Sequence, residues 1–499
     1  MSKTIHEICK IPLREPQRHI LQNLDDSKFH IIKAPTGVGK SFVAAHIAQQ
    51  YNGALILCPD RGLQNQYIQE MDISNLWGRA HYHCHHYDTS CDYCNDLLTN
   101  DIDQKKENVK KEHDAICEYT IAKNDFKESH YGVTGVELCY YGIKNEADCL
   151  IIDEAHNLID KLTNLTSNKI SSRSVLFGGA FATLNFQLNE GKITFHDYLN
   201  ECYDIAKDLV DDSLKDRRDK KEKFIGRLEF LVNNPFNSGY ELVEEKNGDI
   251  SVELKRLSFD HAFKHLIGDF KHIFLMSATL PDVELFCKLL GIDQSETNVV
   301  KVGSPFSPDN VKVFCYTQLD LSSKFYQKNV DAAVSLLDEV LDKEPARGVI
   351  HCTSFRQIND IQFKVSRRHK HRLILDTEGL PKSELIKKMR ARPDSVLVSA
   401  SAFQGLDLKG DLGSFTITFK APFPLWSPWM KSMNNRYQSY YHSQALSRFI
   451  QGLGRCLRNE TDKASIYLID RCCGRFIKSQ ELPDNIRNAK RTLMDLKAA

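Results

Sequence analysis

A buried strand that runs into a glycine-rich loop and then into a helix constrains this fold more than any other feature. Apolar residues 29–32 and 42–48 flank the loop at 34–41. Such a loop turns its backbone N–H groups toward phosphate at the helix N-terminus. Lys40 can then reach the β- and γ-phosphates, and Ser41 can hold Mg²⁺. Ala34 stands where the usual pattern has glycine. The predicted nucleotide-binding residues are Thr36, Gly37, Val38, Gly39, Lys40 and Ser41.

Apolar runs that alternate with helix-like segments follow the loop, which is typical of a parallel α/β sheet. A second α/β unit is expected after Pro305 and Pro308, because two prolines suit a linker. Residues 78–118 interrupt the pattern with His, Cys, Asp and Lys, and residues 161–255 are charge-rich and helix-like. The expected strands cover residues 29–32, 54–58, 148–153, 272–276, 348–352, 395–399, 415–419 and 465–469.

Two short motifs place charged side chains where a nucleotide would be hydrolysed. Asp153 and Glu154 end an apolar strand, so one carboxylate can bind Mg²⁺ and the next can orient or deprotonate the attacking water. Gln451, Arg455 and Arg458 fall at i, i+4 and i+7 on one helix face, where two arginines can clamp a phosphate held by another domain. The predicted catalytic residues are Lys40, Asp153, Glu154, Gln451, Arg455 and Arg458, with Ser41 and Asp153 as magnesium ligands.

Four cysteines are spaced C-x6-C-x2-C-x22-C. Four thiolates suit either a [4Fe-4S] cluster or a tetrahedral zinc ion. Nearby His81, His83, His85 and His86 are also good zinc ligands, so the spacing alone leaves both metals open. The N-terminus lacks the apolar core of a secretory signal, which indicates a reducing compartment where cysteines bind metal or pack in the core. The candidate ligands are Cys84, Cys91, Cys94 and Cys117.

Charge balance limits how a nucleic acid could bind. Lys plus Arg and Asp plus Glu number 66 each, so a polyanion needs a local basic patch. The basic run 367–372 could track phosphate or simply be solvated. Further candidates are Arg61 and Arg79 for phosphate, and Tyr82, Tyr131, Trp426 and Trp429 for stacking bases. No apolar run approaches the ~18 residues of a membrane span. We therefore expect no membrane contact and a cytoplasmic protein, which binding to DNA would make nucleoid-associated.

Seven or more ordered segments resemble the superfamily 2 iron–sulfur DNA helicases of the XPD/DinG type. These segments are 14–17, 34–41, 78–84, 91–94, 117–119, 153–156, 277–280, 304–306, 403–407 and 451–458. The resemblance implies an α/β fold with two RecA-like parallel-sheet domains, and with an iron–sulfur insertion and a helical arch insertion in the first. The implied boundaries are 1–77, 121–160 and 256–303 for the first RecA-like domain, 78–120 for the iron–sulfur domain, 161–255 for the arch and 304–499 for the second RecA-like domain.

The same resemblance implies a function. The family resemblance implies a monomeric helicase that uses ATP and Mg²⁺, travels 5′-to-3′ on single-stranded DNA and unwinds duplex at a fork. It adds Gln17 and Asp407 to the nucleotide-binding residues and favours [4Fe-4S] over zinc, with the four cysteines as ligands. Two features depart from the family. Gln404 stands where an acidic residue is common, and the arch is short, at under a hundred residues.

Three other functions stay open. The chain could be an ATP-driven translocase or remodeller that does not separate strands. It could equally be an RNA helicase, since no residue distinguishes a reader of the 2′-hydroxyl. A metal-containing subunit that binds nucleic acid and has a vestigial ATPase is the third, which the intact Lys40, Glu154, Arg455 and Arg458 oppose.

Overall fold

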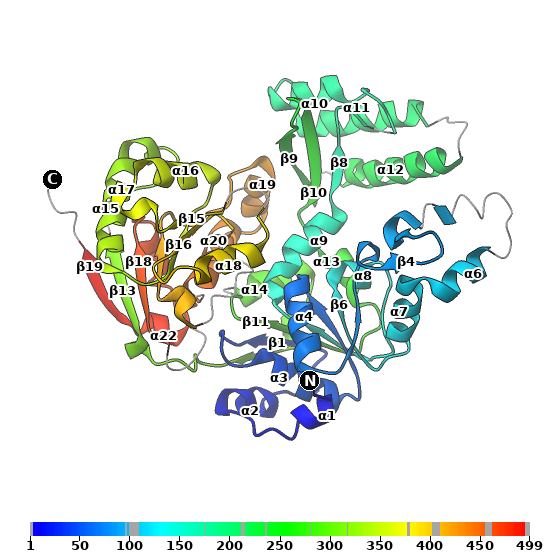
Figure 1. Cartoon of the computed structure of the whole chain (residues 1–499). Helices are drawn as coiled ribbons and strands as arrows, with labels where there is room; N and C mark the ends of the chain where they lie inside the picture. The colour runs from blue at the N-terminus through cyan, green and yellow to red at the C-terminus, as the bar shows by residue number, and fades with distance from the viewer. Residues whose placement is uncertain are drawn as a thin grey trace.

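Two seven-stranded sheets organise the chain (Figure 1). The first has the order β12-β1-β11-β7-β2-β6-β3 and the second β15-β16-β14-β17-β18-β13-β19, and neighbouring strands in both are parallel. The computed structural model describes residues 3–94, 97–98, 109–174, 176–210, 215–234, 237–280, 282–316, 318–376, 380–401, 410–454 and 462–494.

The first lobe buries its sheet between two layers of helices. Alternate residues of one strand face opposite layers: Ile32 joins the core under α3, whereas Ile31 joins the core under α13 and α14. Its elements are α1 (Ile5–Ile8), α2 (Glu15–Gln22), β1 (Phe29–Lys33), α3 (Lys40–Gln50), β2 (Ala54–Cys58), α4 (Arg61–Glu70), β3 (Ser74–Leu76), β6 (Tyr131–Gly135), α8 (Val136–Tyr140), β7 (Cys149–Ile152), α9 (Leu158–Thr166), α13 (Asp260–Ile267), β11 (His272–Ser277), α14 (Val283–Leu290) and β12 (Thr297–Lys301).

The second lobe repeats this architecture. Its central strands β14 and β17 are fully buried, as their apolar sequences require. Its elements are β13 (Val311–Tyr316), α15 (Tyr326–Lys343), β14 (Gly348–His351), α16 (Phe355–Lys364), α17 (Arg367–Lys370), β15 (Leu373–Leu375), α18 (Lys382–Arg390), β16 (Val396–Ser399), β17 (Phe415–Thr418), α19 (Pro428–Arg436), α20 (Tyr440–Leu453), β18 (Ala464–Leu468), α21 (Cys473–Phe476), α22 (Asp484–Arg487) and β19 (Lys490–Met494).

Two smaller parts extend the first lobe. The cysteine-rich part contains β4 (His83–Cys84), β5 (Thr89–Ser90), α6 (Val109–Ile116) and α7 (Glu118–Lys127). The insertion that follows α9 contains β8 (Asn168–Ile170), α10 (Ala182–Asn189), α11 (Phe195–Asp208), α12 (Lys215–Asn233), β9 (Ser238–Glu244) and β10 (Ile250–Arg256). Figure 1 shows the insertion above the cysteine-rich part.

The insertion is not purely helical. Its three strands form an antiparallel sheet in the order β8-β10-β9, which the helix-like interpretation of residues 161–255 did not include. The sequence carried the signal, because apolar and polar residues alternate along 250–256, as in a half-buried strand. The preceding Asn247-Gly248 pair suits a hairpin turn, and Gly248 has a φ of +82°.

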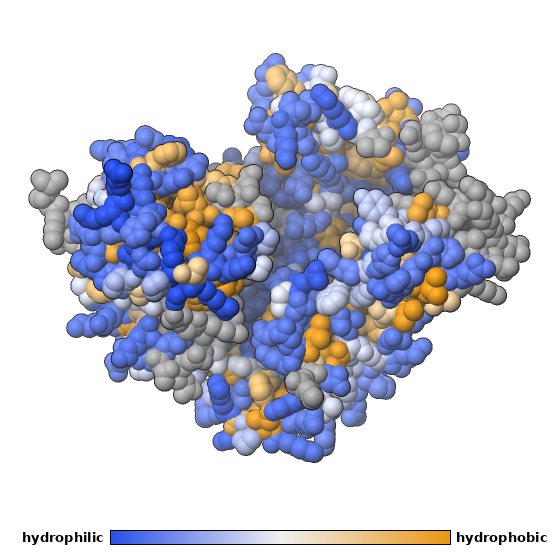
Figure 2. Space-filling view, viewed as in Figure 1, coloured by the Kyte–Doolittle hydropathy of each residue, from blue (hydrophilic) through white to orange (hydrophobic). Residues whose placement is uncertain are grey.

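Helices α19 and α20 connect the second lobe to the rest. Trp429 of α19 packs in the core of the first lobe and donates from Nε1 to the Arg256 carbonyl of the insertion at 3.0 Å. Helix α20 begins in that same core at Tyr440 and ends in the core of the second lobe at Leu453. The surface is hollowed where the lobes and the insertion meet (Figure 2). No described helix is long and apolar enough to cross a membrane.

Candidate nucleotide site and cysteine-rich centre

The glycine loop joins the buried end of β1 to the first turn of α3. Gly37 and Gly39 have φ values of +88° and +83°, which only glycine adopts at low cost. A Cβ on Gly37 would lie 2.3 Å from the Phe306 ring, and a Cβ on Gly39 would lie 2.6 Å from Gln17 Nε2. The loop can therefore keep this course only with glycine at both positions, and it leads the chain to the N-terminus of α3, where phosphate is favoured.

Gln17 lies against this loop from α2. Its Nε2 donates to the Val38 carbonyl at 2.9 Å, and its Oε1 accepts from the Arg14 N–H at 2.9 Å. The side chain is buried. Both ends of the amide are thus held, so the structure brings Gln17 to the loop that the sequence predicted to bind nucleotide.

Asp153 and Glu154 follow β7, which pairs with β11, and β11 lies beside β1, the strand that leads into the loop. Lys40 Nζ lies 3.3 Å from Glu154 Oε1. Asp153 is buried and accepts at Oδ1 from the Glu154 N–H at 2.8 Å. Burial raises the pKa of Asp153, while the positive charge of Lys40 opposes that shift. Glu154 has a φ of +48°, which is strained for this residue type and common at functional sites.

Tyr67 of α4 completes this carboxylate pair, although no sequence signal pointed to it. Its hydroxyl donates to Asp153 Oδ2 at 2.9 Å, and its side chain is fully buried. Both oxygens of Asp153 are therefore engaged by fixed donors, which sets the direction in which the carboxylate faces.

A chain of polar contacts leads from Glu154 to the second lobe. His156 Nδ1 lies 3.3 Å from Glu154 Oε2 and 2.9 Å from Ser277 Oγ. The Thr279 N–H donates to Ser277 Oγ at 3.1 Å, and Gln451 Nε2 of α20 donates to Thr279 Oγ1 at 3.1 Å. The loop after β11 therefore connects the carboxylates of one lobe with a helix of the other.

The structure describes part of the predicted face of α20. Gln451 is buried at the lobe interface. A Cβ on Gly454 would lie 3.5 Å from Thr36 Oγ1, so the end of α20 approaches the loop closely. Arg455, Arg458, Gln404 and Asp407 lie outside the described residues.

The four predicted cysteine ligands converge, and all are fully buried. Cys91 Sγ lies 3.5 Å from Cys117 Sγ, and Cys94 Sγ lies 3.3 Å from the Cys91 carbonyl. Sulfurs of Cys84, Cys94 and Cys117 lie within 4.8 Å of one another and of a ring nitrogen of His113. The sequence did not single out His113, because it lies apart from the histidines at 81–86.

Three of these histidines have partners other than the sulfurs, and the ring of the fourth, His86, lies 6.0 Å from the ring of His113. His83 Nε2 lies 3.1 Å from Asp88 Oδ1, and His85 Nε2 lies 3.1 Å from Glu118 Oε1. His81 contacts Arg61. If the site binds zinc, the nitrogen ligand would therefore come from His113 and not from the histidines at 81–86.

The donor chemistry fits a metal group. Burial raises the pKa of Cys91 to about 11 and raises that of Cys94 as well, so these thiols stay protonated unless a cation stabilises the thiolates. The four sulfurs and one imidazole can hold either an iron–sulfur cluster or zinc.

Most of the predicted base-stacking residues have structural partners. Trp429 is buried, and Tyr82 packs between Trp77 and Tyr119. Trp426 remains 51% exposed and is the best placed for a base among these candidates. The two arginine candidates also lie on aromatic rings: Arg61 lies over Trp77 and Arg79 over Tyr119.

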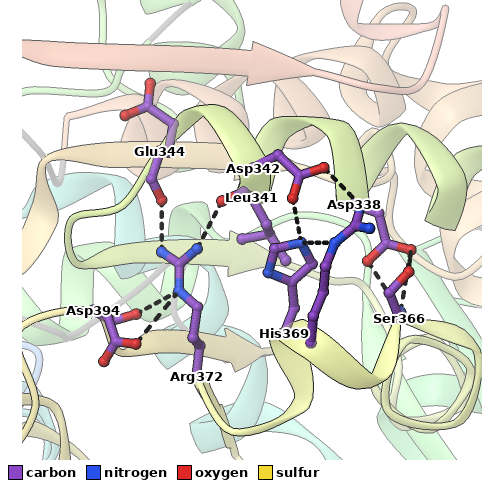
Figure 3. A network of polar contacts seen from close by, with 9 residues as sticks. Asp338, Leu341, Asp342, Glu344, Ser366, His369, Arg372 and Asp394 are labelled. Atoms are coloured by element: carbon purple, nitrogen blue, oxygen red, sulfur yellow. Dashed lines mark hydrogen bonds and ion pairs between the residues drawn. The ribbon is translucent and has the colours of Figure 1, made fainter.

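The basic run 367–372 contributes to the second-lobe core as well as to the surface (Figure 3). Arg372 is buried and donates to the Leu341, Glu344, Ala346 and Asp394 carbonyls at 2.6–3.1 Å. His369 is buried beside Asp342. Arg372 therefore binds the C-terminal end of α15 and cannot track phosphate.

Comparisons with known proteins show which families and relatives this chain is similar to. Residues 337–489 match the Helicase C-terminal domain family, and residues 10–181 match the family described as type III restriction enzyme, res subunit. The ATP-dependent DNA helicase YoaA of Escherichia coli is 24% identical over 388 residues, which cover 65% of this chain and 60% of YoaA. The ATP-dependent DNA helicase DinG of Photobacterium profundum is 26% identical over 272 residues, covering 50% of this chain and 38% of DinG.

Solved structures show the same fold. An XPD helicase structure superposes with a TM-score of 0.62 at 16% identity, covering 97% of this chain and 100% of that one. The S. tokodaii Xpd4 structure has a TM-score of 0.61 at 14% identity, with 96% and 100% covered. The chain therefore has the fold of the XPD helicase structures, and its sequence is similar to ATP-dependent DNA helicases. The two parallel-sheet, RecA-like domains predicted from the sequence are thereby confirmed.

The chain spans 60% of YoaA and 38% of DinG. The two family matches fall on different lobes. The type III restriction enzyme, res subunit match lies on the lobe of the first parallel sheet, and the Helicase C-terminal domain match lies on the lobe of the second.

Proposed function

We propose that this chain is an ATP-dependent DNA helicase that moves 5′-to-3′ along single-stranded DNA and separates duplex at a fork. The proposal rests on the contacts that Thr279 makes with Ser277 and Gln451, which we call the junction at Thr279. This junction connects the carboxylates beside the glycine loop with α20 of the other lobe. The names of YoaA and DinG, both ATP-dependent DNA helicases, support ATP as the nucleotide that is hydrolysed and DNA as the nucleic acid along which the protein moves. Net charge of zero favours a local contact surface, for which the hollow between the lobes is suited.

ATP and Mg²⁺ bind between the lobes in this proposal. The amides of residues 36–41 and the Lys40 ammonium hold the phosphates, and Gln17 and Asp407 add nucleotide contacts. Ser41 and Asp153 hold Mg²⁺, which neutralises charge on the phosphates. Glu154, positioned between Lys40 and His156, orients the attacking water. Gln451, Arg455 and Arg458 complete the site from the second lobe.

Hydrolysis is coupled to movement through the junction at Thr279. Loss of the γ-phosphate changes what Glu154 faces, and His156 and Ser277 connect that change to Thr279. Thr279 in turn contacts Gln451 and Ser447 on α20. Because α20 packs in both cores, its displacement alters the angle between the lobes and shifts the grip on the strand.

We further propose a [4Fe-4S] cluster at the cysteine-rich centre, with Cys84, Cys91, Cys94 and Cys117 as ligands and zinc as the alternative. When bound, this group supplies a cross-link between β4, α7 and residues 91–94. Buried free thiols from three separate segments support a metal rather than a packing role.

The test is strand displacement by anaerobically purified protein, on DNA and RNA duplexes with either a 5′ or a 3′ tail. Lys40→Ala and Glu154→Gln should each lower ATP turnover by about 100-fold or more while binding of single-stranded DNA persists. Lys10→Ala, at an exposed site in the same lobe, is the matched control. Displacement only from the 5′ DNA tail is expected. Strong ATPase without displacement would favour the translocase, and displacement of RNA duplexes alone would favour the RNA helicase.

A further inference from the structure

The cysteine-rich centre contains a fifth donor that the four-cysteine ligand set does not use. His113 lies one helical turn before Cys117, and its carbonyl accepts the Cys117 N–H at 2.9 Å. The residue is 1% exposed, so its ring finds its polar partners inside the protein. Its Nε2 lies 3.4 Å from Cys94 Sγ, and its Nδ1 lies 2.9 Å from Asp114 Oδ1.

We propose that His113 is a positioning residue for the metal centre, which donates a hydrogen bond from Nε2 to the sulfur of Cys94 and thereby raises the reduction potential of the cluster. The inference rests on the cluster proposed above, whose ligand set it leaves unchanged. His113 is added as the neighbour that orients one ligand sulfur.

The direction of this hydrogen bond follows from the chemistry of the sulfur. A thiol that binds metal loses its proton, so Cys94 Sγ then has only lone pairs to offer. The neighbouring ring nitrogen must therefore be the donor. The Asp114 carboxylate accepts a second hydrogen bond from Nδ1 and so fixes the orientation of the ring. In this proposal the ring therefore carries a proton on each nitrogen and donates from both.

The expected effect on the cluster is electrostatic. Reduction adds an electron to a group that thiolates already make negative, and a donor to a ligand sulfur stabilises the more negative state. Hydrogen bonds to the sulfurs are among the factors that set cluster potentials. The bond to Cys94 is buried, where a hydrogen bond to an anion is strong and water cannot replace it.

The experiment measures the reduction potential of the cluster in the full-length protein by an anaerobic redox titration, followed by its visible absorbance. His113→Leu removes the donor at similar volume, and His113→Gln keeps an N–H that can reach the sulfur. His85→Leu is the control, because His85 lies in the same part of the chain but contacts Glu118. We expect a more negative potential for His113→Leu, a smaller shift for His113→Gln and none for His85→Leu. An unchanged potential in His113→Leu with full iron content overturns the proposal.

A second measurement uses the protein without substitution, in case His113→Leu loses its cluster. Pulsed EPR of the reduced protein labelled with ¹⁵N-histidine should detect one weakly coupled histidine nitrogen, and its absence overturns the proposal. Iron and sulfide content is measured first. Zinc without iron refutes the proposed cluster and this inference with it. A cluster whose potential is unchanged in His113→Leu refutes the role of His113 alone.

Discussion

A single hydroxyl determines how Asp153, the carboxylate proposed to bind magnesium, is presented. Tyr67 donates to Asp153 Oδ2, and the Glu154 N–H occupies Oδ1. Neither bond can be exchanged for water, because Tyr67 and Asp153 are both buried. A carboxylate held in this way offers its remaining lone pairs in one direction, which is the pre-organisation that phosphoryl transfer depends on.

We predict that Tyr67→Phe weakens the binding of Mg²⁺ without unfolding the lobe. Loss of a hydrogen bond to a charged acceptor costs about 1.5–3 kcal/mol, so the Mg²⁺ concentration at half-maximal ATPase should rise roughly tenfold or more. The measurement is ATPase rate against Mg²⁺ concentration at saturating ATP. Tyr141→Phe, at a site that is 70% exposed, should behave as the unaltered protein. An unchanged Mg²⁺ dependence in Tyr67→Phe would show that Asp153 does not need this partner.

At the scale of elements, the end of helix α15 depends on one arginine. A helix leaves its last carbonyl groups without partners in the helix, and Arg372 binds the Leu341 and Glu344 carbonyls at this end. It also bonds the Asp394 carbonyl just before β16. The side chain therefore holds α15 to the edge of the second sheet (Figure 3).

Arg372→Ala should destabilise the second lobe by roughly 2–4 kcal/mol, because several buried carbonyl groups lose their donor. Hydrogen-exchange mass spectrometry should show faster exchange in β15 and β16. Arg367→Ala, at an exposed site in the same basic run, is the control. Affinity for single-stranded DNA should be unchanged for folded Arg372→Ala protein. If Arg372→Ala protein were stable but bound DNA more weakly, the result would show that Arg372 contacts phosphate and does not stabilise the lobe.

Contact between α19 and the insertion is a second dependence between elements. Trp429 lies against Gly239 of β9, where a Cβ would stand 3.2 Å from the indole ring. We predict that Trp429→Ala costs about 3–5 kcal/mol and increases exchange in β9 and β10. Trp426→Ala, which removes an exposed ring, should leave the thermal midpoint within a degree or two of the unaltered protein. Equal exchange in both variants would mean that the insertion holds its position without α19.

At the scale of the whole molecule, helix α20 packs in the cores of both lobes. Gln451 lies on this helix, α20, and contacts Thr279 across the lobe interface. Lys33 and Glu481 form a second connection between the lobes, at 2.5 Å. Because these contacts lie beside the proposed nucleotide, closure of the lobes and hydrolysis are expected to depend on each other.

Gln451→Ala should retain ATP binding but lose most of the stimulation of ATPase by single-stranded DNA, by about tenfold. The physical reason is that Thr279 loses its partner on α20 while the glycine loop stays intact. ATPase is measured with and without single-stranded DNA, beside Gln438→Ala, an exposed glutamine just before the same helix. Stimulation equal to that of Gln438→Ala would exclude the Thr279 junction as the coupling element.

The sequence by itself determined the features that local chemistry dictates. The glycine loop, the buried strands, the carboxylate pair and the four cysteines each follow from residues adjacent in the chain, where periodicity and spacing are readable. Six strands of the two large sheets were not predicted. Four of them, β3, β12, β15 and β19, are edge strands, and β6 and β13 each lie next to an edge strand, where pairing depends on the rest of the sheet. The sheet of the insertion was overlooked for a different reason, since the charge of its neighbouring helix dominated the interpretation of that segment.

Only the tertiary structure decided which distant residues meet. Tyr67 and Asp153 are 86 positions apart, Thr279 and Gln451 are 172 apart, and Cys94 and His113 are 19 apart. Nothing in the local pattern of a buried tyrosine or histidine says which partner it will have, because core packing alone would place it in the same way. The sequence likewise could not predict the partners of Arg372. Its charge suggested a surface role, but in the structure it binds carbonyl groups at the end of α15. Parallel sheets bring the ends of separate strands to one edge, and that convergence assembles the site.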